Sequence, residues 1–247
     1  MKFIGIIPAR YASTRFPGKP LADMKGKPMI QRVYEQVSRV LDNVCVATDH
    51  PDIEAAVKAF GGNVIRSLKE HPSGTDRCHE AYHLLGGKED IIINIQGDEP
   101  FIKPEQIEAI ISCFDDPDTN IATLVRPFEP HEGWETLANP NSPKVILDKN
   151  NYAITFSRSV IPYLRGVDTD QWLSRHTFYK HIGMYAFKAQ TLDKLTALPQ
   201  SSLELAESLE QMRWIENGYK IKTAITTQET IGIDTPDDMA RAILMIP

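Results

Sequence analysis

The chain has 247 residues, of which 42% are hydrophobic, and its 27 lysines and arginines stand against 33 aspartates and glutamates. This length and apolar content suit one large α/β domain or two small ones. The formal net charge of -6 argues against a basic face that follows a nucleic acid backbone, so we expect no nucleic acid partner and look for a local anion site.

The three cysteines, Cys45, Cys78 and Cys113, are too widely spaced for a zinc site built on close pairs or for a disulfide framework. The apolar run near the N-terminus is shorter than a signal peptide needs, and no run approaches the ~20 apolar residues of a membrane span. We therefore expect a reduced, cytoplasmic protein without membrane association.

The first half of the chain alternates short Val/Ile-rich runs with amphipathic stretches. Helices are expected to begin at Pro28, Pro51 and Pro104, because proline is favoured at the first helical position. This alternation is typical of βα units that build a parallel sheet, in which ligands bind beyond the carboxyl ends of the strands. The expected strands are 3–7, 43–47, 63–66, 91–95 and 121–125.

The second half is less regular. An irregular stretch over 129–143 precedes an expected hairpin that turns at 149–151. A strand over 183–187, a helix over 203–217 and a helix from Pro236 follow. We predict one domain over 1–247, with an inserted hairpin or dimerisation segment around 127–185.

The loop after the first strand, "IIPARYASTRFPGKPL", carries Arg10, Arg15 and Lys19. Arginine offers a planar fork that suits phosphate or carboxylate, and lysine offers a compact charge, so the three cations together suit a polyphosphate. The loop is neither a P-loop nor a dinucleotide motif, because Gly18-Lys19 is followed by Pro20 and no G-x-G-x-x-G is present. The alternative is a solvated surface loop.

Two carboxylates are candidate metal ligands. Asp98 follows the most apolar strand, in "IIINIQGDEP", where a carboxylate can hold Mg²⁺ over bound phosphates. Asp234, in "IGIDTPDDM", could provide a second carboxylate or could cap the helix that follows. Both roles of Asp234 stay open at this point.

The segment "HPSGTDR" has Ser73 three residues before Asp76, a spacing that resembles a capping box with a shortened acid. Capping alone would explain the segment. Its hydroxyls and its glycine could equally line a pocket for a nucleotide base.

The residues from His79 to His83 match the H-E-x-x-H motif of zinc peptidases, with Glu80 as the general base. We favour a solvated helical face instead. The helix lies among βα units, so its exposed face is expected beside the sheet and away from the carboxyl ends of the strands. Gly86, which also fits the longer peptidase pattern, is explained as a helix stop.

The expected helix over 203–217 has an apolar stripe that leaves Glu207, Glu210 and Gln211 together at spacings of three and four. Such polar residues are commonly just solvated. They could also accept hydrogen bonds from sugar hydroxyls.

Taken in order, several of these segments resemble the 3-deoxy-manno-octulosonate cytidylyltransferase family, the CMP-Kdo synthetases of lipopolysaccharide assembly. The resemblance spans essentially the whole chain. The loop after the first strand alone would indicate only the wider group of sugar nucleotidyltransferases. The matching segments are "IPARYASTRFPGKPL", "VATDH", "SGTDR", "QGDEP", "FSRSVIP", "HIGMYAF", "SLELAESLEQMRW" and "GIDTPDDM".

The resemblance implies a Rossmann-like nucleotide-diphospho-sugar transferase fold, with a mixed, mostly parallel sheet and helices on both faces. It implies a homodimeric enzyme that joins CTP to 3-deoxy-D-manno-octulosonate (Kdo) and releases pyrophosphate, with Mg²⁺ as cofactor. Nothing in the residues from Ser73 to Arg77 demands cytosine over uracil, so the choice of CTP rests on the resemblance.

The resemblance also implies roles for single residues. Arg10, Lys19 and Asp98 are expected to be catalytic, and Asp98 and Asp234 to hold the metal. The expected nucleotide-binding residues are Arg10, Ser13, Arg15, Lys19, Ser73, Gly74, Thr75, Arg77 and Gln96. The expected sugar-binding residues are Arg15, Gln96, Arg158, His181, Tyr185, Glu210 and Gln211.

This assignment agrees with simple electrostatics. Both substrates are anions that repel each other, and phosphoryl transfer depends mainly on positioning and charge neutralisation. We expect in-line attack by the C2 hydroxyl of the sugar on the α-phosphorus. An acylneuraminate cytidylyltransferase and a non-catalytic nucleotide-binding module remain the alternatives.

Overall fold

The computed structural model describes residues 1–229 and 232–246. These residues form two compact units. The first unit holds Met1–Glu108, Met184–Thr196 and the described C-terminal residues 232–246, and the second holds Ala109–Gly183 and Ala197–Glu229. The expectation of one domain over 1–247 with an inserted segment stays a prediction.

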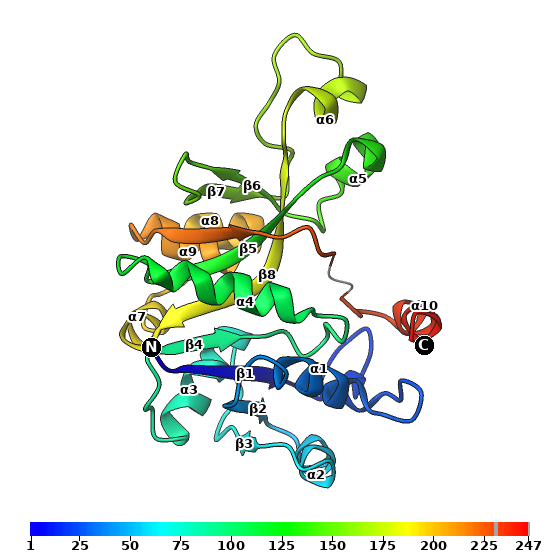
Figure 1. Cartoon of the computed structure of the whole chain (residues 1–247), viewed down its shortest axis with the longest axis vertical. Helices are drawn as coiled ribbons and strands as arrows, with labels where there is room; N and C mark the ends of the chain where they lie inside the picture. The colour runs from blue at the N-terminus through cyan, green and yellow to red at the C-terminus, as the bar shows by residue number, and fades with distance from the viewer. Residues whose placement is uncertain (230–231, 247) are drawn as a thin grey trace. The chain divides into compact units, whose positions relative to one another are not determined.

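The first unit is built on a mostly parallel sheet (Figure 1). Its parallel strands are β1 (Phe3–Ala9), β2 (Val44–Thr48), β3 (Val64–Arg66) and β4 (Ile91–Asn94), in the order β3-β2-β1-β4. The last part of β8 (Tyr179–Lys188) adds antiparallel to β4, with Tyr185 opposite Asn94. The four expected parallel strands are thus present, with ends that differ by one or two residues, whereas the strand expected over 183–187 begins four residues earlier, at Tyr179.

Local sequence explains these elements. Every residue of β2 and β4 is buried, as the runs of β-branched residues in strands covered on both faces require. Pro51 occupies the start of its helix, as predicted, and His50 caps it by accepting from the Asp52 N–H. The helices of this unit are α1 (Met29–Val37), α2 (Pro51–Ala59), α3 (Gly74–Leu84), α4 (Pro104–Ser112, which continues into the second unit), α7 (Ala189–Thr196) and α10 (Pro236–Leu244).

The C-terminal segment packs against the segment after β1 through a small apolar cluster. Met239 and Ala242 of α10 and the preceding Ile233 are buried in one cluster with Met24 and Met29. Burial of such side chains stabilises the contact by roughly 1.5–3 kcal/mol each. As a result the residues just before α10 lie beside the cationic loop.

The second unit contains four strands and the first part of β8. Strand β5 (Ile121–Pro127) pairs in parallel with β9 (Ile221–Ile225), and the predicted hairpin is present as antiparallel β6 (Lys144–Leu147) and β7 (Ala153–Ser157). An aromatic cluster that includes Trp172 and Phe178 is buried in this unit. Its shorter helices are α5 (Gly133–Ala138), α6 (Trp172–Arg175), α8 (Ser202–Glu207) and α9 (Glu210–Glu216).

The prediction of one helix over 203–217 is wrong. The segment forms two helices, α8 and α9, because Ser208 adopts a left-handed conformation with φ of 50°. The Arg158 guanidinium donates to the carbonyl oxygens of Glu207, at 2.6 Å, and of Ser208, at 3.1 Å. These bonds hold the carbonyl groups that the helix break leaves without intrahelical partners.

None of the helices within residues 1–229 and 232–246 has both the length and the apolar character that crossing a membrane requires.

Candidate active site

A pocket of about 360 Å³ lies in the first unit, at the carboxyl ends of β1 and β4. Four cationic side chains and two carboxylates line it, a charge pattern that suits an anion together with a cation. The charged lining residues are Arg10, Arg15, Lys19, Arg77, Asp98 and Asp234, and the others are Pro8, Ala9, Ser13, Pro20, His71, Pro72, Ser73, Gly74, Gln96 and Gly97.

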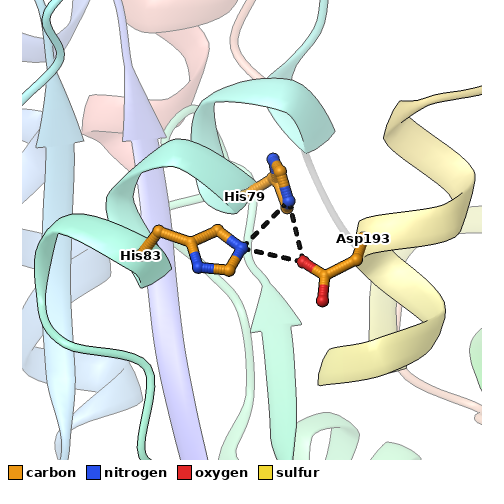
Figure 2. Close-up of side chains that lie close together, drawn as sticks. All are labelled: His79, His83 and Asp193. Atoms are coloured by element: carbon orange, nitrogen blue, oxygen red, sulfur yellow. Dashed lines mark hydrogen bonds and ion pairs between the residues drawn. The ribbon is translucent and has the colours of Figure 1, made fainter.

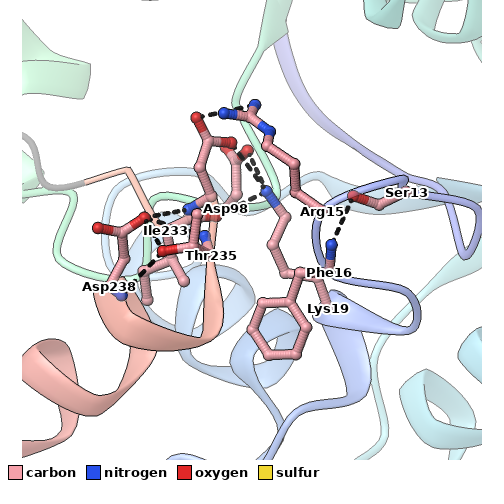
Figure 3. Close-up of polar contacts among 9 residues, drawn as sticks. Ser13, Arg15, Phe16, Lys19, Asp98, Ile233, Thr235 and Asp238 are labelled. Carbon is pink, nitrogen blue, oxygen red and sulfur yellow. Dashed lines mark hydrogen bonds and ion pairs between the residues drawn. The ribbon is translucent and has the colours of Figure 1, made fainter.

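Lys19 is the most enclosed of the loop cations. Its side chain is 13% exposed, against 64% for Arg15. The Nζ atom donates to Asp98 Oδ2 at 2.8 Å and to the Ile233 carbonyl oxygen at 2.6 Å, and it lies 3.5 Å from Asp234 Oδ1 (Figure 3). The structure thus brings one ammonium and two carboxylates from three separate segments together. Arg15 adds an ion pair with Asp234, at 3.1 Å.

Gly97 allows the loop that follows β4 to pack closely against the loop that follows β1. A Cβ atom on this residue would lie 2.8 Å from the carbonyl oxygen of Pro8, at the end of β1. Only glycine fits such a backbone approach without a shift. The close packing of Gly97 on Pro8 therefore sets Asp98 beside the loop that carries Lys19.

The alternative that Asp234 caps the following helix is wrong, because another residue caps α10. Thr235 is the cap, since its Oγ1 accepts from the Asp238 N–H at 3.1 Å, and the Asp238 carboxylate accepts in turn from the Thr235 N–H. The hydrogen bond from the Thr235 hydroxyl lowers the pKa of Asp238 to about 2. Because Thr235 and Asp238 satisfy the cap, the Asp234 carboxylate is left for Lys19 and Arg15.

The start of α3 forms another wall of the pocket. Ser73 Oγ accepts from the Asp76 N–H at 3.1 Å and donates to the Asp76 carboxylate at 2.6 Å, so the expected capping role is present. Ser73 and Gly74 at this helix end line the pocket, and the helix dipole favours an anion there. Capping and ligand binding are therefore compatible at this helix end.

Two residues predicted to bind nucleotide, Arg77 and Thr75, form hydrogen bonds with other residues of the protein. Arg77 lines the pocket, but it is buried and donates to Asp49 at 2.7 Å and to Ser67 at 3.2 Å. Thr75 is buried outside the pocket lining, where its hydroxyl accepts from Asn94 Nδ2 at 3.5 Å. Both residues therefore fix the start of α3.

His71 also lines the pocket, with a side chain that is 4% exposed, although no sequence pattern predicts it as a site residue. Its Nε2 lies 2.8 Å from Glu80 Oε2, which also accepts from the Leu68 N–H at 3.1 Å. Burial acts to raise the pKa of Glu80, but these hydrogen bonds outweigh it, so the pKa lies below its usual value. The only signal was the position of His71 two residues before the helix cap. The Glu80 carboxylate therefore bonds to His71 and to the Leu68 N–H, and does not serve as the general base that a zinc peptidase needs.

Most residues predicted to bind the sugar lie outside this pocket lining. Arg15 and Gln96 line it, whereas Tyr185 is on β8 in the first unit. The remaining four belong to the second unit and are Arg158, His181, Glu210 and Gln211.

Three of these residues, His181, Glu210 and Gln211, contact other residues of the second unit or are buried. His181 Nε2 lies 3.0 Å from Thr123 Oγ1, and loss of solvent lowers the pKa of His181 to about 3, so the ring is neutral near pH 7. Glu210 pairs with the buried Arg213 at 3.4 Å. Gln211 is buried, and among the described residues its Nε2 has no hydrogen-bond acceptor.

Comparison with known proteins agrees with this architecture. The family model described as cytidylyltransferase matches residues 4–221. A 3-deoxy-manno-octulosonate cytidylyltransferase of Parabacteroides distasonis is 68% identical over 247 residues, covering 100% of this chain and 98% of its own length. An 8-amino-3,8-dideoxy-manno-octulosonate cytidylyltransferase of Shewanella baltica is 46% identical, covering 96% of this chain and 95% of its own length.

A solved structure of CMP:2-keto-3-deoxy-manno-octonic acid synthetase complexed with CTP has a TM-score of 0.90 and 41% identity, covering 100% of this chain and 98% of that one. The predicted fold class, a nucleotidyltransferase with a mixed, mostly parallel sheet, is thereby confirmed. The predicted enzyme class is confirmed by the family match. This chain belongs to the cytidylyltransferase family.

Proposed function

We propose that the chain is an enzyme that transfers CMP from CTP to Kdo and releases pyrophosphate, and so activates this sugar acid for lipopolysaccharide synthesis. The names of its relatives at 68% and 41% identity support this choice of substrates. The single observation that carries the chemistry is the convergence of Lys19, Asp98 and Asp234 in a pocket rimmed by arginines.

The triphosphate would bind among the loop cations and the first turn of α3. Arg10 and Arg15 would offer planar forks to phosphate oxygens, and the N-terminus of α3 at Gly74 would add the positive end of the helix dipole. Ser13, Ser73 and Gln96 would complete the nucleotide contacts. Arg77 and Thr75 would act through the position of α3, because both already have partners within the protein.

Membership of the family implies a divalent cation, and we propose Mg²⁺ held by Asp98 and Asp234. The donor set fits, because both carboxylates approach the same positive group, the Lys19 ammonium, and Mg²⁺ prefers carboxylate oxygens and phosphate oxygens. When bound, such a cation would neutralise phosphate charge and polarise the oxygens it touches.

The chain's own residues then position the reactants and stabilise charge. The C2 hydroxyl oxygen of Kdo attacks the α-phosphorus, and its proton passes to solvent. The bond from the α-phosphorus to the bridging oxygen breaks, and the electron pair leaves with pyrophosphate. Arg10 and Lys19 would stabilise the negative charge that grows on these oxygens, which is where preorganised charges contribute most to the rate.

Within the first unit, Arg15, Gln96 and Tyr185 are the proposed sugar ligands. Within the second unit, His181, Glu210 and Gln211 keep the same proposed role, and Arg158 would position α9 through the turn at Ser208. Gln211 supports this assignment, because a buried amide donor without an acceptor among the described residues is costly unless a ligand supplies one.

Release of pyrophosphate from a small matrix of substrates tests the proposal. We expect the highest kcat/KM with CTP and Kdo, at least 100-fold above UTP with Kdo or CTP with N-acetylneuraminate. The 8-amino-3,8-dideoxy analogue is included because a 46% identical relative bears its name. A preference for the analogue would change the sugar but keep the reaction, whereas nucleotide binding without any pyrophosphate release would refute the enzyme.

We also propose that residues 1–247 work as one nucleotidyltransferase domain in a cytoplasmic homodimer. The segment around 127–185 would supply the dimer surface. Two apolar side chains in it, Ile154 and Tyr163, are 54% and 75% exposed. Sedimentation of the wild type and of Ile154→Asp distinguishes a dimer that this change weakens from a monomer that it leaves unaltered.

A further inference from the structure

The H-E-x-x-H segment is not a simply solvated helical face, because its two histidines meet a carboxylate from another helix. His79 and His83 lie one turn apart on α3, and Asp193 reaches them from α7 within the same unit (Figure 2). His79 Nε2 and His83 Nε2 lie 2.9 Å and 2.8 Å from Asp193 Oδ1, and 3.1 Å from each other. Three potential ligand atoms therefore converge on one point.

No placement of protons on the two imidazoles gives favourable hydrogen bonds between all three atoms. A carboxylate oxygen only accepts, and a protonated imidazole nitrogen only donates. If both Nε2 atoms carry protons, two N–H groups face each other across 3.1 Å. If one of them is deprotonated, its lone pair faces the carboxylate oxygen. A cation among the three atoms, in contrast, accepts a lone pair from each of them.

The donor set selects the kind of cation. Two imidazoles and one carboxylate suit Zn²⁺ and neighbouring transition metals, whereas Mg²⁺ prefers oxygen ligands alone. Donors placed tetrahedrally around zinc lie about 3.3 Å apart, so small side-chain shifts would open the observed triangle enough. The side chains are 29%, 52% and 47% exposed for His79, His83 and Asp193, which leaves room for entry and for a water as fourth ligand.

We propose that His79, His83 and Asp193 form a binding site for a transition-metal dication such as Zn²⁺, which fastens α3 to α7. The site is structural and not that of a peptidase, because Glu80 is bonded to His71 and to the Leu68 N–H. It is separate from the pocket, whose lining includes Ser73, Gly74 and Arg77 near the start of α3, but neither histidine. The inference does not depend on the proposed transferase activity.

Zn²⁺ titration by calorimetry, in buffer with saturating Mg²⁺, tests the site on the full chain. The wild type is expected to bind one Zn²⁺ that Mg²⁺ does not displace. His83→Ala and Asp193→Asn are each expected to weaken binding at least tenfold, since loss of a direct ligand should exceed the effect of an outer-shell change. Asp193→Asn retains the shape of the side chain, which separates metal binding from packing.

Two controls make the outcome decisive. His131→Ala removes an exposed imidazole elsewhere, and Asp98→Asn removes the proposed Mg²⁺ ligand, so neither should alter the Zn²⁺ affinity. Zn²⁺ at about 100 times Kd should also raise the Tm of the wild type by about 5–10 °C, and that of Asp193→Asn much less. Absence of Zn²⁺ binding, or equal affinity in wild type, His83→Ala and Asp193→Asn, would overturn the proposal.

Discussion

Lys19 Nζ lies 2.8 Å from Asp98 Oδ2, although the two residues are 79 positions apart in the chain. One follows β1 and the other follows β4, and these strands are neighbours in the sheet. The same ammonium donates to the Ile233 carbonyl oxygen and approaches Asp234. Lys19 therefore contacts both the carboxylate that follows β4 and the C-terminal segment from the loop that follows β1.

If Lys19 has the proposed role, replacing it with methionine should lower kcat by about 100-fold or more, because the charge that would stabilise departing pyrophosphate is lost. The apolar stem of methionine retains much of the packing. Lys88→Met, an exposed lysine on the same unit, is the matched control. Steady-state pyrophosphate release checks the effect, and a kcat within threefold of the wild type would remove Lys19 from the catalytic group.

Gly97→Ala should destabilise the protein by about 1–3 kcal/mol, because the added methyl group meets the Pro8 carbonyl oxygen at 2.8 Å. Urea unfolding measures the change. Gly183→Ala is the control, since a Cβ atom there meets no heavy atom within 4 Å. Equal effects of the two substitutions would show that the close approach at Gly97 is unimportant.

His181 should make stability depend on pH. Its pKa is lowered from 6.5 to about 3 by burial, so between these values the unfolded chain binds more protons than the folded one. The free energy of unfolding should therefore fall by about 2 kcal/mol as pH drops from 7 to 5. His181→Gln, which keeps a polar group near Thr123, should remove this part of the slope. His131→Gln, at an exposed position, is the control and should keep the wild-type slope. If His181→Gln also keeps the wild-type slope between pH 7 and 5, His181 does not cause the pH dependence.

Arg158→Lys should raise the KM for Kdo roughly tenfold and leave the KM for CTP unchanged. The guanidinium donates to three carbonyl groups, of Pro140, Glu207 and Ser208, and a single ammonium does not reproduce that fork. Arg165→Lys, at an exposed position, serves as control. An equal rise in the KM values for Kdo and CTP would indicate a general loss of structure. It would argue against a specific role of Arg158 in positioning the sugar-binding residues.

Much of the first unit could be predicted because local signals agree with the fold. Isoleucine runs mark β4, and Pro51 and Ser73 mark helix starts that the structure contains. The sequence also indicates that Lys19 and Asp98 follow strands, and parallel strands present their carboxyl ends at one edge. Which strands are neighbours is a property of the topology, so the direct contact of Lys19 with Asp98 could not be read from either segment.

The features that were missed depend on contacts between distant segments. Ser208 is neither glycine nor proline, and its left-handed conformation accompanies bonds from Arg158, 50 residues away. The histidines of α3 look solvated until α7 brings Asp193 beside them. Spacing within one helix contains no information about such partners.

Turnover of CTP and Kdo by the wild type and by Asp98→Asn at saturating Mg²⁺ tests the proposed transferase activity and the proposed metal ligand together. We expect pyrophosphate and CMP-Kdo to appear in equal amounts with the wild type, and about 100-fold or more slowly with Asp98→Asn. Near-normal turnover by Asp98→Asn would contradict the role given to the carboxylate that Lys19 contacts.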